Sequence, residues 1–215
     1  MDKLRLKFKK TGRAVYISHL DLMRTMQRVF SRAGVDLKYS EGFNPHAKIS
    51  IILPLTVGTH SECEYMDFAL ASDCDLAALP GRLNPYMPEG IEAIEAYEAP
   101  EKGANLRWLR VTGRMTGGRG AAFYSAFFAR DEILVTKRGK KGHKKVDRVD
   151  NIAPAIGRAD FTDGGDGTVY ADLVIHAQDP ALSPDTMMAA LGEDAPAYFV
   201  FTRREAFRED MTPFR

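Results

Sequence analysis

The chain has 215 residues, of which 45% are hydrophobic and 27% are charged. These fractions are ordinary for a globular protein and exclude wholesale disorder, and the length suits one large domain or two small ones. The 30 lysines and arginines nearly balance the 29 aspartates and glutamates, so the formal net charge is +1. Counted by block, however, residues 1–50, 51–106, 107–148 and 149–215 carry +7, −8, +9 and −7. A near-neutral chain can therefore still present a basic face.

The first half of the chain predicts the element order β-α-β-β-α-β. Basic and apolar residues alternate from Lys3 to Lys9, which predicts a strand with one buried face. Ser18 is a suitable N-cap, and apolar residues then recur at helical spacing up to Gly34, a natural C-cap. The other elements predicted here are strands at 48–55, 64–70 and 91–97 and a short helix at 75–83.

The second half repeats roughly the same order, with one extra strand or an interrupted one. It begins with a predicted strand at 106–113 and a helix at 120–130, followed by a hairpin of strands 132–138 and 145–152. The last predicted elements are a strand at 169–176, a helix capped by Ser183 that ends at Leu191, and a strand at 197–202. We therefore expect an α+β fold of two tandem ferredoxin-like (βαββαβ) units, residues 1–99 and 106–215.

Neither a membrane segment nor a cofactor is expected. The start MDKLRLKFKK lacks the apolar core of a signal peptide, and no run approaches the roughly 20 apolar residues that span a bilayer. Cys63 and Cys74 are too few for a disulfide framework, so the protein should be cytoplasmic. The five histidines show no paired ligand spacing, which predicts no metal site, and GxGxxG is absent.

The segment Tyr39–His46, with the sequence YSEGFNPH, is the most unusual part of the chain. We expect Tyr39 and Phe43 to stack on bases, while Asn44, His46 and Lys48 contact base edges or phosphates. The alternative is a structural loop in which Phe43 fills the core.

His46 and His19 are the candidate groups for proton transfer, because histidine titrates near neutral pH. In an enzyme, Tyr39 or Ser40 would assist them. Ser18, His19 and Asp21 have the residue types of a hydrolytic triad, but neighbours at a helix start do not generally converge. Three arginines spaced four apart would form one helical stripe that binds phosphates or an acidic partner, or is simply solvated: Arg24, Arg28 and Arg32.

The predicted hairpin tip is the strongest electrostatic signal. Between residues 137 and 145, six of nine residues are cationic, and two glycines interrupt them. Such a tip can follow a nucleic-acid backbone through salt-sensitive contacts, bind an acidic protein, or serve only solubility. The six expected phosphate contacts are Lys137, Arg138, Lys140, Lys141, Lys144 and Lys145.

Four segments together resemble a known family: 12–21 (which ends in ISHLD), 39–46, 54–58 (PLTVG) and 61–67 (SECEYMD). They are similar to the bacterial radical SAM-linked protein family, a domain of unknown function that is free-standing or fused to a radical-SAM protein. The hairpin segment 135–141 extends the similarity. The resemblance implies a bacterial protein with a radical-SAM partner in trans, since this chain lacks a CxxxCxxC cluster motif. It implies no catalytic residue.

Three functions remain open from the sequence. The first is an accessory module that binds RNA, such as tRNA or rRNA, and works with a radical-SAM enzyme. The second is an RNA-acting enzyme, a ribonuclease or a base-modifying enzyme, that uses His19 or His46. The third is a protein-binding adaptor whose charge blocks dock a radical-SAM partner.

Overall fold

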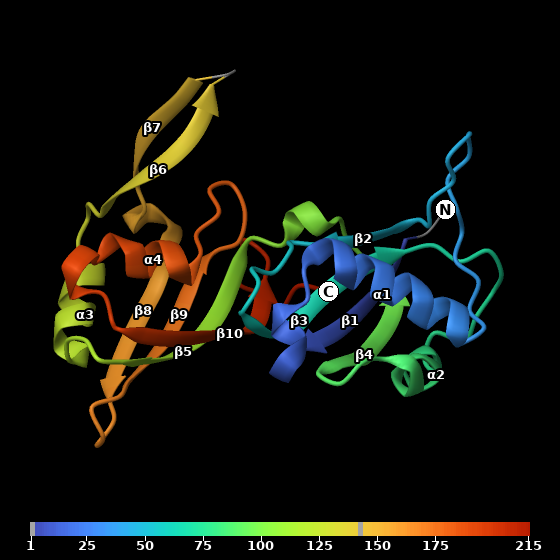
Figure 1. Cartoon of the computed structure of the whole chain (residues 1–215), viewed down its shortest axis with the longest axis horizontal. Helices are drawn as coiled ribbons and strands as arrows, with labels where there is room; N and C mark the ends of the chain where they lie inside the picture. The colour runs from blue at the N-terminus through green and yellow to red at the C-terminus, as the bar shows by residue number, and fades with distance from the viewer. Residues whose placement is uncertain (1–2, 142–143) are drawn as a thin grey trace. The chain divides into compact units, whose positions relative to one another are not determined.

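The computed structural model describes residues 3–141 and 144–215, which fall into two compact units (Figure 1). The first unit comprises Met1–Asn105 and Phe214–Arg215, and the second comprises Leu106–Pro213. The second unit was expected to run to residue 215, whereas the last two residues group with the first unit. Each unit combines helices with an antiparallel sheet, so the class is α+β.

The first unit contains a four-stranded antiparallel sheet and two α-helices. Its strands pair in the order β4-β1-β3-β2. Along the chain the elements are β1 (Leu4–Lys10), α1 (His19–Arg32), β2 (Ile49–Ile52), β3 (His60–Phe68), α2 (Leu79–Leu83) and β4 (Ile91–Glu98). The connections contain the short 3-10 helices η1 (Gly12–Tyr16), η2 (Asn84–Tyr86) and η3 (Gly103–Asn105).

Helix α1 begins and ends at the residues its sequence indicates. The Ser18 hydroxyl accepts a hydrogen bond from the Asp21 amide at 3.2 Å, which caps the first turn. The helix then buries one apolar face, which includes Met26 and Phe30, against the sheet. Gly34, with a φ of +64°, follows the last turn in the left-handed conformation that glycine adopts readily.

The predicted basic face of β1 is wrong at Arg5, which is 0% exposed, and Lys10 at the other end of the strand is only 1% exposed. A buried charge requires partners. Lys10 Nζ donates to the carbonyl oxygens of Val15 at 3.2 Å and Ile17 at 2.8 Å, so it ties η1 and the start of α1 to β1. Burial lowers the pKa of Lys10, whereas the nearby Glu64 carboxylate acts to raise it.

Arg5 connects β1 to β3 and to the C-terminal residues. Its Nε and Nη2 donate to the two carboxylate oxygens of Asp67 at 2.7 and 3.3 Å. Nη1 donates to the carbonyl oxygen of Arg215 at 2.6 Å, and Nη2 to that of Glu101 at 2.9 Å. The guanidinium also lies over the ring of Phe214, 4.7 Å from its centroid. Because Phe214 is only 2% exposed, it completes the core on this side of the first sheet.

Tyr97 of β4, which pairs with Arg5 in the sheet, gives a test of this region by pH. Burial raises the pKa of Tyr97 to about 12, and its hydroxyl has no hydrogen-bond partner among the described residues. The phenol therefore ionises at a lower pH in the unfolded chain, where its pKa is near 10, than in the folded protein. As a result, the free energy of unfolding falls as the pH rises from about 10 to 12.

We expect Tyr97→Phe to leave the free energy of unfolding unchanged or slightly increased at pH 8, since no hydrogen bond is lost. Between pH 8 and 11 its stability should fall less than that of the wild type. Urea unfolding at both pH values measures this difference. Equal losses in the two proteins would show that Tyr97 keeps an ordinary pKa.

The second unit has the same strand arrangement with a hairpin added. Its main sheet is antiparallel and pairs in the order β10-β5-β9-β8. The elements are β5 (Trp108–Thr116), α3 (Ala121–Phe128), β6 (Leu134–Lys141), β7 (Lys144–Asn151), β8 (Ile156–Asp163), β9 (Val169–His176), α4 (Pro184–Ala190) and β10 (Tyr198–Phe207). Short 3-10 helices η4 (Ala153–Ala155) and η5 (Gly192–Asp194) lie between them. In both units the fourth strand of the main sheet pairs with the first, the first with the third, and the third with the second.

The predicted hairpin exists, but the prediction missed β8. Strands β6 and β7 pair with each other as a separate two-stranded sheet, and β8 takes the edge position beside β9. β8 has few apolar residues (IGRADFTD), which explains the lack of a strand signal in this segment. Its Phe161 is its main anchor, because the rings of Tyr124 and Phe128 on α3 lie 5.6 and 5.7 Å from it.

In the part of the chain that the structure describes, no helix is both long and apolar enough to cross a membrane.

Candidate nucleic-acid interface

The segment Tyr39–His46, here called the motif loop, is a narrow excursion between α1 and β2. Tyr39 pairs with Ala47 in an isolated antiparallel bridge, and the Lys48 amide donates to the Lys38 carbonyl oxygen at 2.7 Å. Between them, the Ser40 amide donates to the His46 carbonyl oxygen at 2.8 Å. The loop therefore has a hydrogen-bonded neck, and Figure 1 shows it projecting from the first unit.

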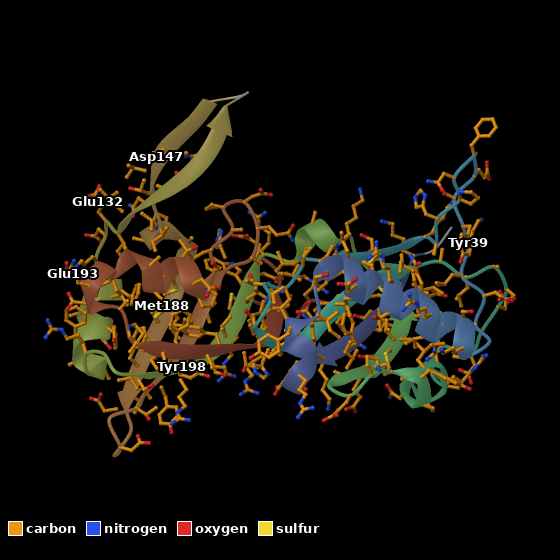
Figure 2. All side chains as sticks on the ribbon, in the orientation of Figure 1. Tyr39, Glu132, Asp147, Met188, Glu193 and Tyr198 are labelled. Atoms are coloured by element: carbon orange, nitrogen blue, oxygen red, sulfur yellow. The ribbon has the colours of Figure 1, made fainter. Side chains whose placement is uncertain are left out.

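The loop exposes its aromatic side chains. Phe43 is 111% exposed relative to a reference residue, and Tyr39 is 54% exposed and points outward at the loop (Figure 2). The alternative in which Phe43 fills the core is therefore wrong. Asn44 is also exposed. A ring with both faces in water is available for stacking on a base without displacing any protein contact.

Ser40 and His46 brace the neck. The Ser40 hydroxyl accepts a hydrogen bond from the His46 amide at 3.0 Å and lies 2.9 Å from His46 Nδ1. A serine beside an imidazole is the geometry of a nucleophile and its base. Here the same hydroxyl also closes the loop, so its contacts are those of a structural clamp.

A groove of about 370 Å³ lies at the foot of the motif loop. Lys3, His46 and Lys48 line it together with Asp67, and the exposed edge strand β2 forms one wall. Two lysines and a histidine at a concave surface suit a phosphate group.

The structure does not bring His19 to the motif loop. His19 is the exposed first residue of α1, and the loop follows the other end of this 14-residue helix, which is about 21 Å long. The predicted arginine stripe is exposed along the same helix, and Arg24 forms an ion pair with Asp21 at 3.2 Å. Arg28 and Arg32 line a groove of about 390 Å³ opposite Tyr86, a second place where phosphate and ring could meet.

The basic hairpin is described only by its backbone near the tip. Asn151 fixes its base, since its Oδ1 accepts from the Ile133 amide at 2.9 Å and its Nδ2 donates to the Asp131 carbonyl oxygen at 3.2 Å. The hairpin extends away from the rest of the second unit (Figure 1). The side chains of the six predicted phosphate contacts lie outside the described part of the structure: Lys137, Arg138, Lys140, Lys141, Lys144 and Lys145.

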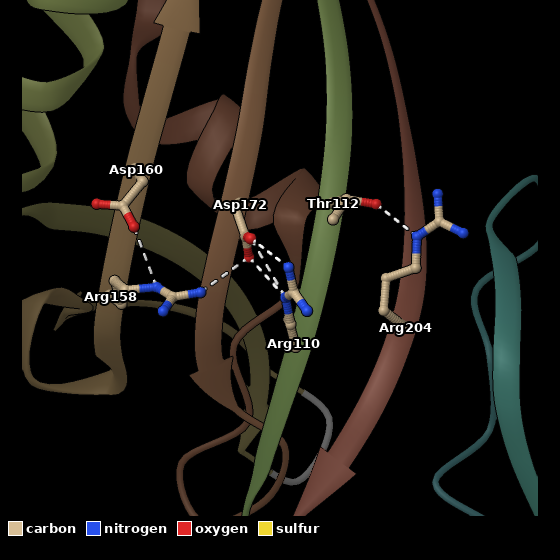
Figure 3. Close-up of polar contacts among 6 residues, drawn as sticks. All are labelled: Arg110, Thr112, Arg158, Asp160, Asp172 and Arg204. Carbon is tan, nitrogen blue, oxygen red and sulfur yellow. Dashed lines mark hydrogen bonds and ion pairs between the residues drawn. The ribbon is translucent and has the colours of Figure 1, made fainter.

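Sequence reasoning missed a polar surface on the main sheet of the second unit, on the face opposite α3 (Figure 3). Asp172 on β9 accepts hydrogen bonds from Arg110 on β5, at 2.6 to 3.2 Å, and from Arg158 on β8 at 3.1 Å. The Arg158 Nε lies 3.1 Å from the Asp160 carboxylate. Hydrogen bonds from Arg110, followed by those from Arg158, lower the pKa of Asp172.

Period-two alternation on β5 and β9 could have indicated that these residues share a face. It could not have indicated β8, which supplies Arg158 and Asp160 and which lacks a strand signal. The surface therefore depends on pairings that are not visible in any one segment.

The two antiparallel sheets with their helices define a mixed α+β protein that exposes aromatic and cationic side chains. The family of uncharacterized proteins conserved in bacteria, DUF2344, matches residues 3–184, and the chain belongs to this family. No curated protein matches the chain.

Among solved structures, the fold is similar to a chain in the crystal structure of a Cbf5-Nop10-Gar1 complex. The TM-score is 0.52 at 10% sequence identity, and the match covers 96% of this chain. This chain spans about half of the matched one, since 50% of the latter is covered. At this identity the likeness concerns the fold alone.

Proposed function

We propose that this protein is a bacterial, cytoplasmic accessory module that binds single-stranded RNA, such as a segment of tRNA or rRNA, and works with a radical-SAM enzyme that modifies it. The observation that carries the RNA proposal is the motif loop. It holds a fully exposed Phe43 and an exposed Tyr39 on a braced neck, above a groove lined by Lys3, His46 and Lys48. Proteins bind single-stranded nucleic acids with aromatic rings that stack on the bases and with nearby cations that contact the phosphates.

The architecture supports the same proposal. We infer that each unit is a ferredoxin-like βαββαβ domain, because both have the same element order and strand order once the hairpin is set aside. Four-stranded sheets of this kind commonly bind single-stranded RNA, although fold alone does not determine function. The radical-SAM partner rests on the resemblance of the motif segments to the radical SAM-linked family.

An RNA-acting enzyme receives less support from the geometry. Its two candidate histidines lie apart, since His19 is the first residue of α1 whereas His46 closes the motif loop that follows the other end of this helix. Incubation of cellular RNA with the wild type, His19→Ala and His46→Ala tests this alternative. Cleavage or modification by the purified wild type alone would favour an enzyme over an accessory module.

An adaptor function is favoured by a separate exposed apolar group. Tyr16, Leu20 and Val57 are 74%, 65% and 53% exposed, and the Gly58 amide donates to the Val15 carbonyl oxygen at 2.9 Å, which joins their segments. All of them lie within the motif segments. Mixing the protein with a radical-SAM enzyme from the same bacterium, with and without Leu20→Ser, tests this docking. Sequencing of any co-purified nucleic acid decides between adaptor and RNA module.

We expect Phe43→Ala to weaken binding of a fluorescein-labelled single-stranded RNA by about tenfold, the usual loss of one base–aromatic stack. Phe43→Trp should retain binding because it keeps a ring at the tip. Fluorescence anisotropy measures the affinity, and circular dichroism should be unchanged since the Phe43 side chain is fully exposed. Leu20→Ala is the matched control, an exposed apolar truncation away from the loop. Equal RNA affinity of Phe43→Ala and the wild type would show that the motif loop is not part of the RNA interface.

A further inference from the structure

A second concave surface lies on the main sheet of the second unit. Every second residue of β5, β8, β9 and β10 points to this face of the sheet, and these side chains enclose a hollow of about 490 Å³. The hollow is open to solvent and lined by hydroxyls, charged groups and one aromatic ring. The residues used below are Thr112, Arg114, Asp160, Tyr170, Asp172 and Arg204.

Tyr170 supplies an exposed ring at a fixed position. Its side chain is 50% exposed, and it lies opposite Arg114 in the pairing of β9 with β5. A Cβ added at Gly164 would come 3.0 Å from Tyr170 Cε2, so the glycine turn after β8 packs closely against one edge of the ring. A ring held in this way loses little freedom when a base stacks on it.

The charged groups divide into a neutral network and a cationic side. The network of Arg110, Arg158, Asp160 and Asp172 pairs two arginines with two carboxylates. On β10, Arg204 Nε donates to the Thr112 hydroxyl at 2.7 Å, which orients its guanidinium beside the hollow (Figure 3). Since the network is internally balanced, Arg204 and Arg114 are two further cations in the lining of the hollow, and Asp166 of the neighbouring turn lies close enough to Arg114 to interact with its charge.

We infer that this hollow binds one nucleotide of single-stranded RNA, with the base on Tyr170 and the phosphate at Arg204. β9 and β10 flank β5, so the two groups arise from strands about 9.6 Å apart, comparable to the length of a nucleotide. The carboxylates of Asp160 and Asp172 can accept hydrogen bonds from base amino groups, as acidic side chains do from cytosine. This site rests on the proposed function, which it extends from the motif loop to the second unit.

The test uses the full chain and a single-stranded RNA dodecamer that carries fluorescein and one 4-thiouridine. Tyr170→Ala should weaken binding by about tenfold, Tyr170→Phe should retain it, and photocrosslinks should map to β9. Arg204→Ala should reduce the salt dependence by about one phosphate contact. Arg130→Ala, the loss of an exposed arginine stacked on Phe127 beside α3, is the control and should change neither value.

The outcomes separate this inference from the proposed function. Loss of binding in Phe43→Ala with wild-type affinity in Tyr170→Ala and Arg204→Ala overturns the second site and leaves the motif loop in place. Loss of binding in Tyr170→Ala, with retention in Tyr170→Phe, supports the site. Absence of RNA binding by the wild type overturns both proposals.

Discussion

Replacing the six cations of the β6–β7 hairpin with glutamine is expected to weaken single-stranded RNA binding by about a hundredfold or more at physiological salt. Each phosphate contact contributes about −0.7 to the slope of log affinity against log salt, so six contacts give a slope near −4. Most of that slope should vanish in the variant. The residues replaced are Lys137, Arg138, Lys140, Lys141, Lys144 and Lys145.

Anisotropy titrations at three salt concentrations give both the affinity and the slope. A variant in which only Lys137, Arg138 and Lys140 of β6 are replaced should show an intermediate slope. Arg119→Gln with Arg130→Gln removes two cations near α3 and serves as the control for net charge. An unchanged affinity and slope in the six-residue variant would leave the hairpin with a solubilising role only.

Arg5→Met is expected to lower the free energy of unfolding by about 3–5 kcal/mol, the usual cost of removing one partner of a buried ion pair. Arg5 is 0% exposed and donates to Asp67 and to two backbone carbonyl oxygens. Methionine fills part of the volume but leaves all of these acceptors without their donor, which is more costly than losing the bonds themselves. Asp67→Asn should also be destabilising, because it leaves the buried Arg5 guanidinium without its carboxylate partner.

Urea unfolding followed by circular dichroism measures the loss, and hydrogen exchange detected by mass spectrometry should locate it in β1, β3 and β4. Arg24→Met is the matched control, because its pair with Asp21 is exposed on both sides and such pairs contribute at most about 1 kcal/mol. If Arg5→Met costs no more than this control, the buried cluster does not stabilise the first unit.

Local signals in the sequence predicted the local features of the fold. The caps at Ser18 and Ser183 start helices where expected, because a cap depends only on the residues of one turn. The sequence left open whether Phe43 is exposed or fills the core, and only the structure shows it exposed. The burial of Arg5 could not be predicted from local signals either, because its partners lie 62 to 210 positions away along the chain.

The charge blocks illustrate the same limit. The first block counts 11 basic residues, yet Arg5 and Lys10 are enclosed in the protein and contribute nothing to a basic surface. Conversely, the acidic last block contains Arg158 and Arg204, which join the polar face of the second unit. A charge count along the chain adds together residues that lie in the interior and residues that lie on the surface of the folded protein.

The docking of Phe214 against Arg5 makes the second unit an insertion within the first. During synthesis, residues 1–105 leave the ribosome without the ring and the carbonyl oxygen that Arg5 contacts. At the usual rates of translation, the missing residues follow after roughly 5 to 20 seconds. Arg5 therefore remains hydrated, and the folding of the first unit remains incomplete, until Phe214 and Arg215 have been synthesised. Its final folding step follows the synthesis of the whole second unit, even though its own strands are made first.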